Sequence, residues 1–167
     1  TQLQQSLREL QLAHQGVMTQ FKRLIARIDQ RIKALISKLG WQDDYRRCLS
    51  VPGLGPVNAA ALVCAFNRGS FAGSDAFVAY LGLDVRRRES GIFKGKRKLS
   101  KRGEPELRRL LYCAAKPARC HPRFNQYHHA QINKGYSKIA ANVILARKLA
   151  RIAFALMTRK QTFNKQL

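Results

Sequence analysis

Acidic residues are scarce in this 167-residue chain, which has nine Asp and Glu against 32 Lys and Arg. The nine are Glu9, Asp29, Asp43, Asp44, Asp75, Asp84, Glu89, Glu104 and Glu106. No strand-borne cluster of four acids can be assembled from them. The formal charge of +23 is far above what solubility requires. It favours a polyanionic partner, held by interactions that weaken as the salt concentration rises.

Long apolar runs are also missing. The longest ones are short and broken by Lys or Arg, and none approaches the roughly 20 residues that a transmembrane helix needs. No signal peptide opens the chain. We therefore expect a soluble, cytoplasmic protein with no membrane partner.

The four cysteines, Cys48, Cys64, Cys113 and Cys120, include no Cys-x-x-Cys pair. A ligand set can be drawn from Cys113, Cys120, His121 and His128, but these spacings match no common zinc pattern. We expect no metal in this chain, and ordinary reduced thiols in the core of a cytosolic protein.

Apolar residues recur in steps of four and three along the first 40 residues, which is the heptad pattern of a coiled coil. The seam consists of Leu3, Leu7, Leu10, His14, Val17, Phe21, Leu24, Ile28, Ile32, Leu35 and Leu39, with one stutter after Ile28. This predicts a helix of about ten turns that ends at Gly40. The stripe is too narrow for a buried helix. We expect residues 1–40 to bind a helical partner, either a second copy in a homo-oligomer or another part of a longer protein.

Residues 41–163 are predicted to form one compact helical domain. Periodicity and capping signals predict helices at about 42–50, 57–66, 74–82, 105–117, 123–134 and 137–160. The last is expected to begin at a Ser137 cap and to carry an apolar stripe. That stripe is Ile139, Val143, Leu145, Leu149, Ile152 and Leu156. Between Val85 and Leu99, glycines and alternating basic residues predict a short basic β-hairpin or an extended loop. The fold class is mainly α.

A helix-hairpin-helix is predicted over about residues 48–66. Its turn, Val51-Pro-Gly-Leu-Gly-Pro56, contains Gly53 and Gly55, which permit φ > 0 and a close backbone approach. The unpaired N–H groups and positive helix end of such a turn suit a phosphate oxygen and read no base. The alternative is a turn that only packs one helix against another.

A second basic segment follows. The eleven basic residues from 86 to 109 are Arg86, Arg87, Arg88, Lys94, Lys96, Arg97, Lys98, Lys101, Arg102, Arg108 and Arg109. Such a cluster predicts a surface that follows a nucleic-acid backbone. The alternative is a disordered basic loop that only neutralises charge.

Six short motifs in order carry a resemblance to a known family. They are Val51-Pro-Gly-Leu-Gly-Pro56, Phe77-x-x-Tyr-Leu-Gly-Leu83, Glu89-Ser-Gly91, Ser100-Lys-Arg-Gly103, Leu107-Arg-Arg-Leu-Leu111 and Ala146-Arg-Lys-Leu149. Over about residues 45–163 the chain resembles the C-terminal transposase domain of DEDD-type insertion-sequence transposases, the relatives of Piv-like DNA invertases. Residues 1–40 resemble the coiled coil that joins this domain to the rest.

The resemblance implies a recombinase of two cooperating parts. In that family an N-terminal RuvC-like domain supplies four acids for a divalent metal such as Mg²⁺, and a non-coding RNA guides target choice. The C-terminal domain supplies a serine nucleophile. The acidic domain is absent here, and Thr1 in place of Met also fits a fragment. We expect a C-terminal portion that binds DNA and RNA, holds no cofactor itself and is inactive alone.

Ser90 is the predicted nucleophile. It lies on the family's Ser-Gly motif, between the basic runs Arg86–Arg88 and Lys94–Lys98. Ser100, flanked by Lys98, Lys101 and Arg102, is the second candidate. The sequence places no histidine or carboxylate to activate either serine. A non-catalytic nucleic-acid-binding and oligomerisation module remains the alternative function, and a coiled-coil assembly protein the third.

Overall fold

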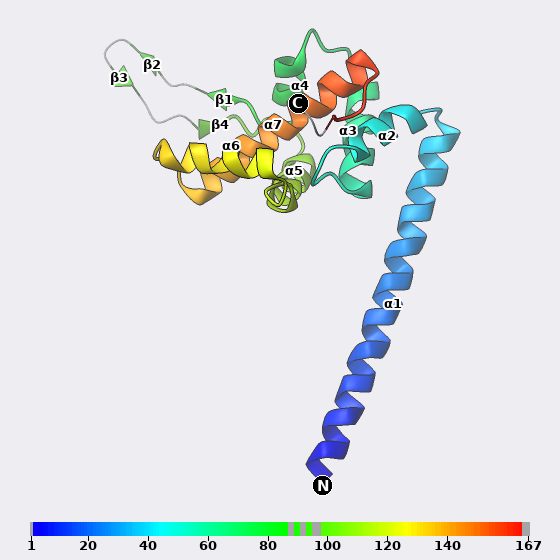
Figure 1. Cartoon of the computed structure of the whole chain (residues 1–167). Helices are drawn as coiled ribbons and strands as arrows, with labels where there is room; N and C mark the ends of the chain where they lie inside the picture. The colour runs from blue at the N-terminus through cyan, green and yellow to red at the C-terminus, as the bar shows by residue number, and fades with distance from the viewer. Residues whose placement is uncertain (1, 87–88, 91–92, 95–97, 165–167) are drawn as a thin grey trace. The chain divides into compact units, whose positions relative to one another are not determined.

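The structure, a computed structural model, describes residues 2–86, 89–90, 93–94 and 98–164. The chain divides into two compact units, Thr1–Gly40 and Trp41–Leu167 (Figure 1). Helices dominate both units, which confirms the mainly α fold class. None of the helices in the described ranges is long and apolar enough to cross a membrane.

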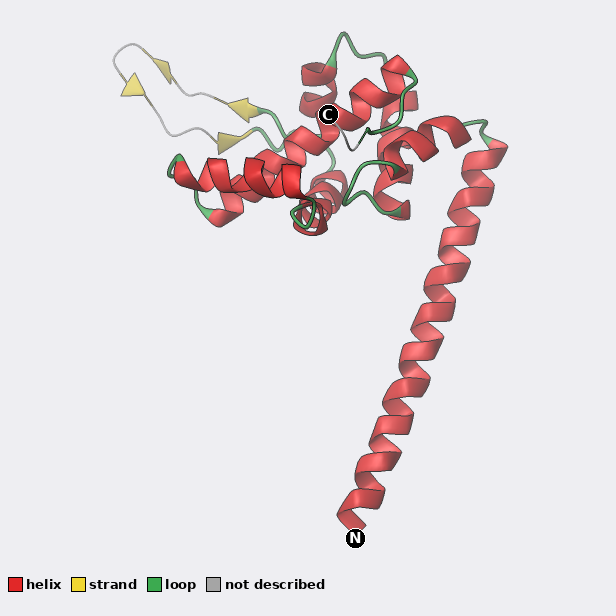
Figure 2. Ribbon diagram, in the orientation of Figure 1, coloured by secondary structure: helices red, strands yellow, loops and turns green. Residues whose placement is uncertain are grey.

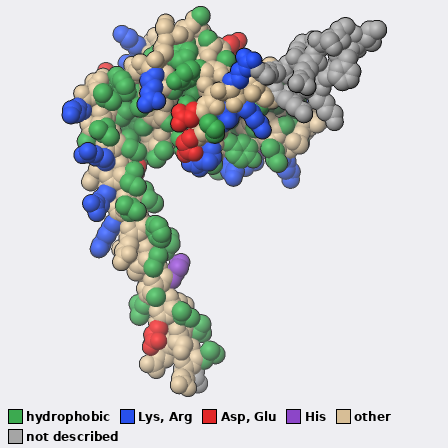
Figure 3. Space-filling view, turned by 180° about the vertical axis from the view of Figure 1, so that it is seen from behind, with side chains coloured by type: hydrophobic (Ala, Val, Ile, Leu, Met, Phe, Trp, Pro, Cys, Tyr) green, Lys and Arg blue, Asp and Glu red, His purple; other side chains and the backbone are tan. Residues whose placement is uncertain are grey.

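The first unit is a single helix, α1 (Gln2–Lys38), of 37 residues. The predicted long N-terminal helix is therefore confirmed. Most of its apolar seam is exposed in the single chain; Leu10, Phe21 and Leu24 are exposed by 67%, 56% and 50%. Figure 3 shows hydrophobic side chains along this helix.

The described residues of the second unit form six helices, each within a few residues of its predicted position. They are α2 (Gln42–Leu49), α3 (Pro56–Arg68), α4 (Ser74–Tyr80), α5 (Pro105–Ala118), α6 (Pro122–Asn133) and α7 (Lys138–Arg159). Three of them begin with proline, whose fixed φ suits the first helical turn and whose missing N–H costs nothing there. Ser137 caps α7 as predicted, since its hydroxyl accepts a hydrogen bond of 3.2 Å from the Ala140 N–H.

Helix α7 is the central element of the second unit. It contacts α2, α3, α4, α5 and α6. Leu145 and Leu149 are buried as predicted, but Ile139 is 68% exposed and lies outside the core. Beside these two leucines, the buried stripe runs through alanines at 141, 146, 150 and 153. Small side chains let the surrounding helices approach α7 closely, which explains why the predicted stripe was partly wrong.

Aromatic rings fill the core beside α7. Phe77 and Phe154 lie 5.4 Å apart between ring centroids, and Phe66 and Phe71 meet them mostly edge-on. Phe77 lies in α4 and Phe154 in α7, so this cluster joins α3, α4 and α7 through the favoured edge-to-face geometry.

Residues 85–99, here called the arm, carry four short strands. They are β1 (Val85–Arg86), β2 (Glu89–Ser90), β3 (Phe93–Lys94) and β4 (Lys98–Leu99). β1 pairs with β4 and β2 with β3, both antiparallel. Figure 2 shows these strands projecting together from the helices of the second unit. Antiparallel strands, rather than an extended loop, therefore occupy the described part of the arm.

Candidate nucleic-acid interface

The turn between α2 and α3 contains the two glycines that we predicted to bind phosphate. At Gly53, φ is +92°, and an added Cβ would lie 2.6 Å from both the carbonyl oxygen of Ala114 and the Cβ of Ala118. Both neighbours belong to α5. Close packing against α5 therefore already explains the glycine at position 53, as the packing alternative proposed.

Gly55 differs from Gly53. It is the N-cap residue of α3 with an ordinary extended backbone, φ −85°, and no side chain caps this helix end. A Cβ added at Gly55 would meet nothing within 4 Å. Packing therefore does not explain this glycine, and the space beside it lies at the positive end of a 13-residue helix.

Part of the predicted basic surface lies outside the described residues, namely Arg87, Arg88, Lys96 and Arg97, together with Gly91. For Arg86, Ser90, Lys94 and Lys98 the structure gives the backbone. Ser90 stands opposite Phe93 in the β2–β3 pair. This pair lies at the far end of the arm from the helices (Figure 1).

Ser100 lies at the opposite end of the arm, directly after β4. Its hydroxyl donates a hydrogen bond to the Asp84 carboxylate. Its N–H donates to the Asp84 carbonyl at 2.9 Å. The sequence placed no carboxylate beside either serine, whereas in the structure the Asp84 carboxylate lies beside Ser100. The structure does not bring Ser90 and Ser100 together into one site.

Two glycines complete this end of the arm. A Cβ added at Gly82, where φ is +70°, would lie 2.6 Å from the backbone nitrogen of Gly103. Arg108 of α5 donates to the carbonyl of Gly103. We call the set Gly82, Asp84, Ser100, Gly103 and Arg108 the foot of the arm. It brings together the motifs around Gly82, Ser100 and Arg108 that carried the family resemblance.

The basic residues around the foot differ in what they can bind. Lys101 and Arg102 are exposed, and the Arg102 N–H approaches the Ser100 hydroxyl at 3.4 Å. Arg109 donates to Glu106 at 2.7 Å, an exposed pairing whose hydrogen bond lowers the pKa of Glu106 and raises that of Arg109. Arg108 and Arg109 are thus engaged within the chain, whereas Lys101 and Arg102 are exposed.

Arg147 of α7 is a basic residue to which the sequence assigned no role. It is half-buried, and its Nε has no hydrogen-bond partner among the described residues. Burial and then the charge of Arg151 lower the pKa of Arg147, while the Asp75 and Asp84 carboxylates act in the opposite direction. The only sequence signal was its place in the motif Ala146-Arg-Lys-Leu149.

The cysteines do not behave as one class. Cys48 is fully buried, and burial raises its pKa from an ordinary 9.0 to about 12. Cys113 and Cys120 are exposed, so the expected core location is wrong for these two. In the part of the chain that the structure describes, no three His, Cys, Asp or Glu side chains gather as metal ligands. These residues do not fit a divalent-metal centre.

Comparisons with known proteins agree with the motifs. The family model described as the Transposase IS116/IS110/IS902 family matches residues 45–129, which include the turn, the arm and the foot. The chain is 30% identical over 148 residues to the transposase for insertion sequence element IS1328 of Yersinia enterocolitica, covering 85% of this chain and 44% of that protein.

Two further relatives extend the comparison. A probable family 20 transposase of Pseudomonas aeruginosa is 32% identical over 147 residues, 84% of this chain and 42% of that protein. A pilin gene-inverting protein of Moraxella lacunata is 28% identical over 149 residues, 86% of this chain and 46% of that protein. The chain thus spans less than half the length of each of these curated relatives.

Proposed function

Because the chain belongs to the IS116/IS110/IS902 transposase family, we propose that it is the C-terminal, DNA-binding and nucleophile-bearing part of a DEDD-type DNA transposase or site-specific recombinase. The match over residues 45–129 carries this proposal, since it includes both the phosphate-binding turn and the serine-bearing arm. The relatives described above are a transposase, a probable family 20 transposase and a pilin gene-inverting protein, and these names support a DNA transposase or recombinase.

DNA binds mainly through its backbone in this proposal. Helices α2 and α3 form the helix-hairpin-helix, and the open space at Gly55 admits a phosphate oxygen to the first N–H groups of α3. The basic residues of the arm and the exposed Lys101 and Arg102 bind further phosphates. Contacts of this kind position DNA without reading its sequence, so target choice falls to a guide RNA, as in the family.

Ser90 is the nucleophile in the proposed reaction. Its hydroxyl attacks a DNA phosphorus: the bond from Ser90 Oγ to phosphorus forms and one phosphorus–oxygen bond of the DNA breaks. The serine proton goes to a water molecule, and the released DNA oxygen takes up a proton from water, so that no net proton is lost. The covalent link conserves the phosphodiester energy for rejoining. Cations of the arm stabilise the negative charge of the crowded intermediate.

Ser100 is a positioning residue in this proposal. Its hydroxyl and its N–H both bind Asp84, so it holds β1 and β4 together where the arm meets the helices. A hydroxyl bound to a carboxylate is also the arrangement of an activated nucleophile, which keeps Ser100 the alternative to Ser90. The two roles give different results on substitution.

The divalent metal, which the family binds through four acids, belongs to the N-terminal part of the intact protein. It would supply charge neutralisation at the reacting phosphate. The present residues do not provide such ligands, so we expect this chain alone to bind nucleic acid without cutting it. The α1 seam joins copies of the chain in the assembled recombinase.

Substitution of the serines in the intact protein tests the mechanism. Ser90→Ala is expected to retain DNA binding within about twofold, because one hydroxyl contributes little to a largely electrostatic interaction, and to abolish strand exchange and the covalent protein–DNA adduct. Ser100→Ala and Asp84→Asn are expected to reduce exchange partially and to leave the adduct on Ser90. Mass spectrometry of the trapped adduct identifies the linked residue.

Two outcomes would contradict this assignment. An adduct on Ser100, with Ser90→Ala active, would transfer the nucleophile to the foot and make Asp84 its base. Normal exchange by both serine variants would exclude a serine mechanism and favour a non-catalytic binding module.

A further inference from the structure

A basic pocket lies away from the arm, at the C-terminal end of the described chain. Its volume is about 910 Å³, and it is formed by α2, the start of α6, the end of α7 and residues 160–164. Its lining combines five basic side chains with Asp43, several uncharged polar side chains and the apolar side chains of Leu156 and Phe163.

The wall formed by residues 160–164 is fixed to the helices. Lys160 ends α7 in the left-handed conformation, with φ +56°, which turns the chain back toward α2. The Phe163 N–H donates to the Ser50 hydroxyl at 2.8 Å, and the Phe163 ring packs against His121 and Phe124 at centroid distances of 6.0 and 5.8 Å. The pocket is therefore part of the folded unit.

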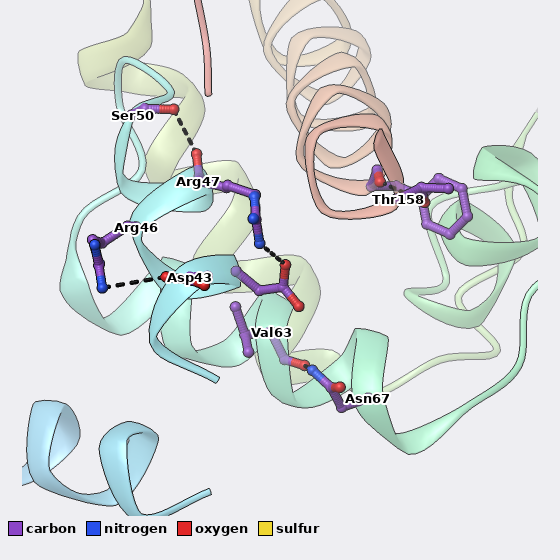
Figure 4. Close-up of polar contacts among 9 residues, drawn as sticks. Asp43, Arg46, Arg47, Ser50, Val63, Asn67 and Thr158 are labelled. Atoms are coloured by element: carbon purple, nitrogen blue, oxygen red, sulfur yellow. Dashed lines mark hydrogen bonds and ion pairs between the residues drawn. The ribbon is translucent and has the colours of Figure 1, made fainter. Parts of the chain in front are cut away.

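Positive charge in the pocket is only partly balanced. Its five basic side chains are Arg46, Arg47, Arg123, Arg159 and Lys160. Arg46 pairs with Asp43 at 3.2 Å and Arg47 with Asp44 at 2.7 Å (Figure 4). Within residues 2–86, 89–90, 93–94 and 98–164, no carboxylate pairs with Arg123, Arg159 or Lys160.

The charge of Arg123 also acts on a neighbouring cation of α7. Lys148, which lies over the Tyr127 ring at 3.7 Å, has its pKa lowered by burial and then by the charge of Arg123. Exposed cations near one another without carboxylates repel each other, and an anion between them relieves that repulsion.

We propose that this pocket binds the phosphate backbone of duplex DNA as a second contact, beyond the turn and the arm. Ser50 joins the two regions, because it begins the turn that leads to Gly55 and also holds Phe163 in the pocket wall. Arg123, Arg159 and Lys160 have no carboxylate partner among the described residues, and successive phosphates of one strand can engage all three at once. The choice of DNA rests on the proposed function.

Salt-dependent DNA binding by the 167-residue chain tests the pocket. The test variant is Arg123→Gln with Arg159→Gln; both side chains are exposed, so the fold is expected to tolerate the change. The control is Arg8→Gln with Lys22→Gln, which removes two exposed charges from α1. Fluorescence anisotropy with a labelled random-sequence duplex measures affinity over a range of salt concentrations, after circular dichroism has confirmed folding.

The slope of log affinity against log salt is negative, and the pocket variant is expected to reduce its magnitude by about 1.8, because each lost phosphate contact reduces the magnitude by about 0.9. The control is expected to leave the slope unchanged. Arg123→Lys with Arg159→Lys, which keeps the charges, should preserve the wild-type slope.

If the pocket variant and the control bind duplex DNA with the same affinity and salt slope, the pocket proposal is overturned. The proposed function is not, since neither the turn nor Ser90 is altered in the variant. The same measurement with single-stranded RNA gives the other outcome. If the pocket variant has a shallower slope than the wild-type chain for RNA and not for DNA, the pocket is assigned to RNA and the proposal for DNA is overturned. A wild-type chain that binds no duplex DNA overturns the pocket and the proposed DNA binding together.

Discussion

Asp84 and Ser100 connect the basic arm to the helices through both side chain and backbone. The serine donates its hydroxyl and its N–H to the same aspartate, one to the carboxylate and one to the carbonyl. A threonine at position 100 would keep both donors, whereas alanine would leave a half-buried carboxylate without its partner. Removing one member of such a pair costs more than the bond itself contributes, typically about 1–3 kcal/mol.

The four thiols are expected to react at very different rates. Cys113 and Cys120 are exposed and should be modified quickly by a thiol reagent, whereas Cys48 is buried and remains protonated because its pKa is about 12. Mass spectrometry after brief treatment with iodoacetamide should find label at 113 and 120 and none at 48. Unfolding in denaturant is the control, and label at Cys48 in the folded chain would contradict its burial.

The direction of the Cys48 shift also has a consequence for stability. Since its folded-state pKa lies above the ordinary 9.0, the buried neutral thiol makes its full contribution to the free energy of unfolding below pH 9. That contribution falls as pH rises from 9 toward 12, because the unfolded chain ionises first.

In the turn between α2 and α3, the two glycines have different roles: Gly53 allows close packing against α5, and Gly55 leaves open space at the start of α3. Gly55→Val is expected to change the free energy of unfolding by no more than about 1 kcal/mol, because nothing lies within 4 Å of its Cβ and φ is −85°. The new side chain should nevertheless obstruct a phosphate and weaken DNA binding about equally for unrelated sequences. Anisotropy with two unrelated duplexes measures this.

Gly53→Ala is the matched comparison. It places a side chain at φ +92° and into contact with α5, so we expect a loss of more than about 1 kcal/mol in the free energy of unfolding, measured by urea denaturation. Unchanged DNA affinity in a folded Gly55→Val protein would exclude this turn as a phosphate site.

Helix α1 predicts the assembly of the chain. Its seam residues are exposed in the single chain, so a second copy should bury them. Val17→Asp should lower the order of assembly measured by light scattering, because an unpaired charge in the seam costs on the order of several kcal/mol. Gln15→Asp adds the same charge outside the seam and should assemble normally. A wild-type chain that is monomeric at tens of micromolar would contradict the prediction that the α1 seam joins two copies.

The limits of sequence-based prediction are clearest in α7. Its boundaries were predictable because local signals set them, namely Ser137 at the start and helical periodicity throughout. Its buried face was predicted only in part, because alanine is ambiguous by hydrophobicity and its burial depends on neighbouring helices from distant parts of the chain.

At the candidate sites too, features set by local sequence were predictable, whereas features set by contacts between distant parts of the chain were not. The charge of +23 and the order of motifs indicated a nucleic-acid partner without any structure. The Asp84–Ser100 pair was missed, although these residues flank β1 and β4 and so stand opposite once that strand register is known. The basic pocket was beyond sequence reasoning, because Phe163 contacts Ser50 across 113 positions.

The foot also bears on how this chain can vary among relatives. The arm enters and leaves the helical unit at one point, where Gly82 meets Gly103 and Asp84 binds Ser100. Antiparallel strands closed at such a point can lengthen by two residues on each side without changing which side chains share a face. Evolution can therefore adjust the reach of the arm by paired insertions, while the helical core beneath it retains its packing.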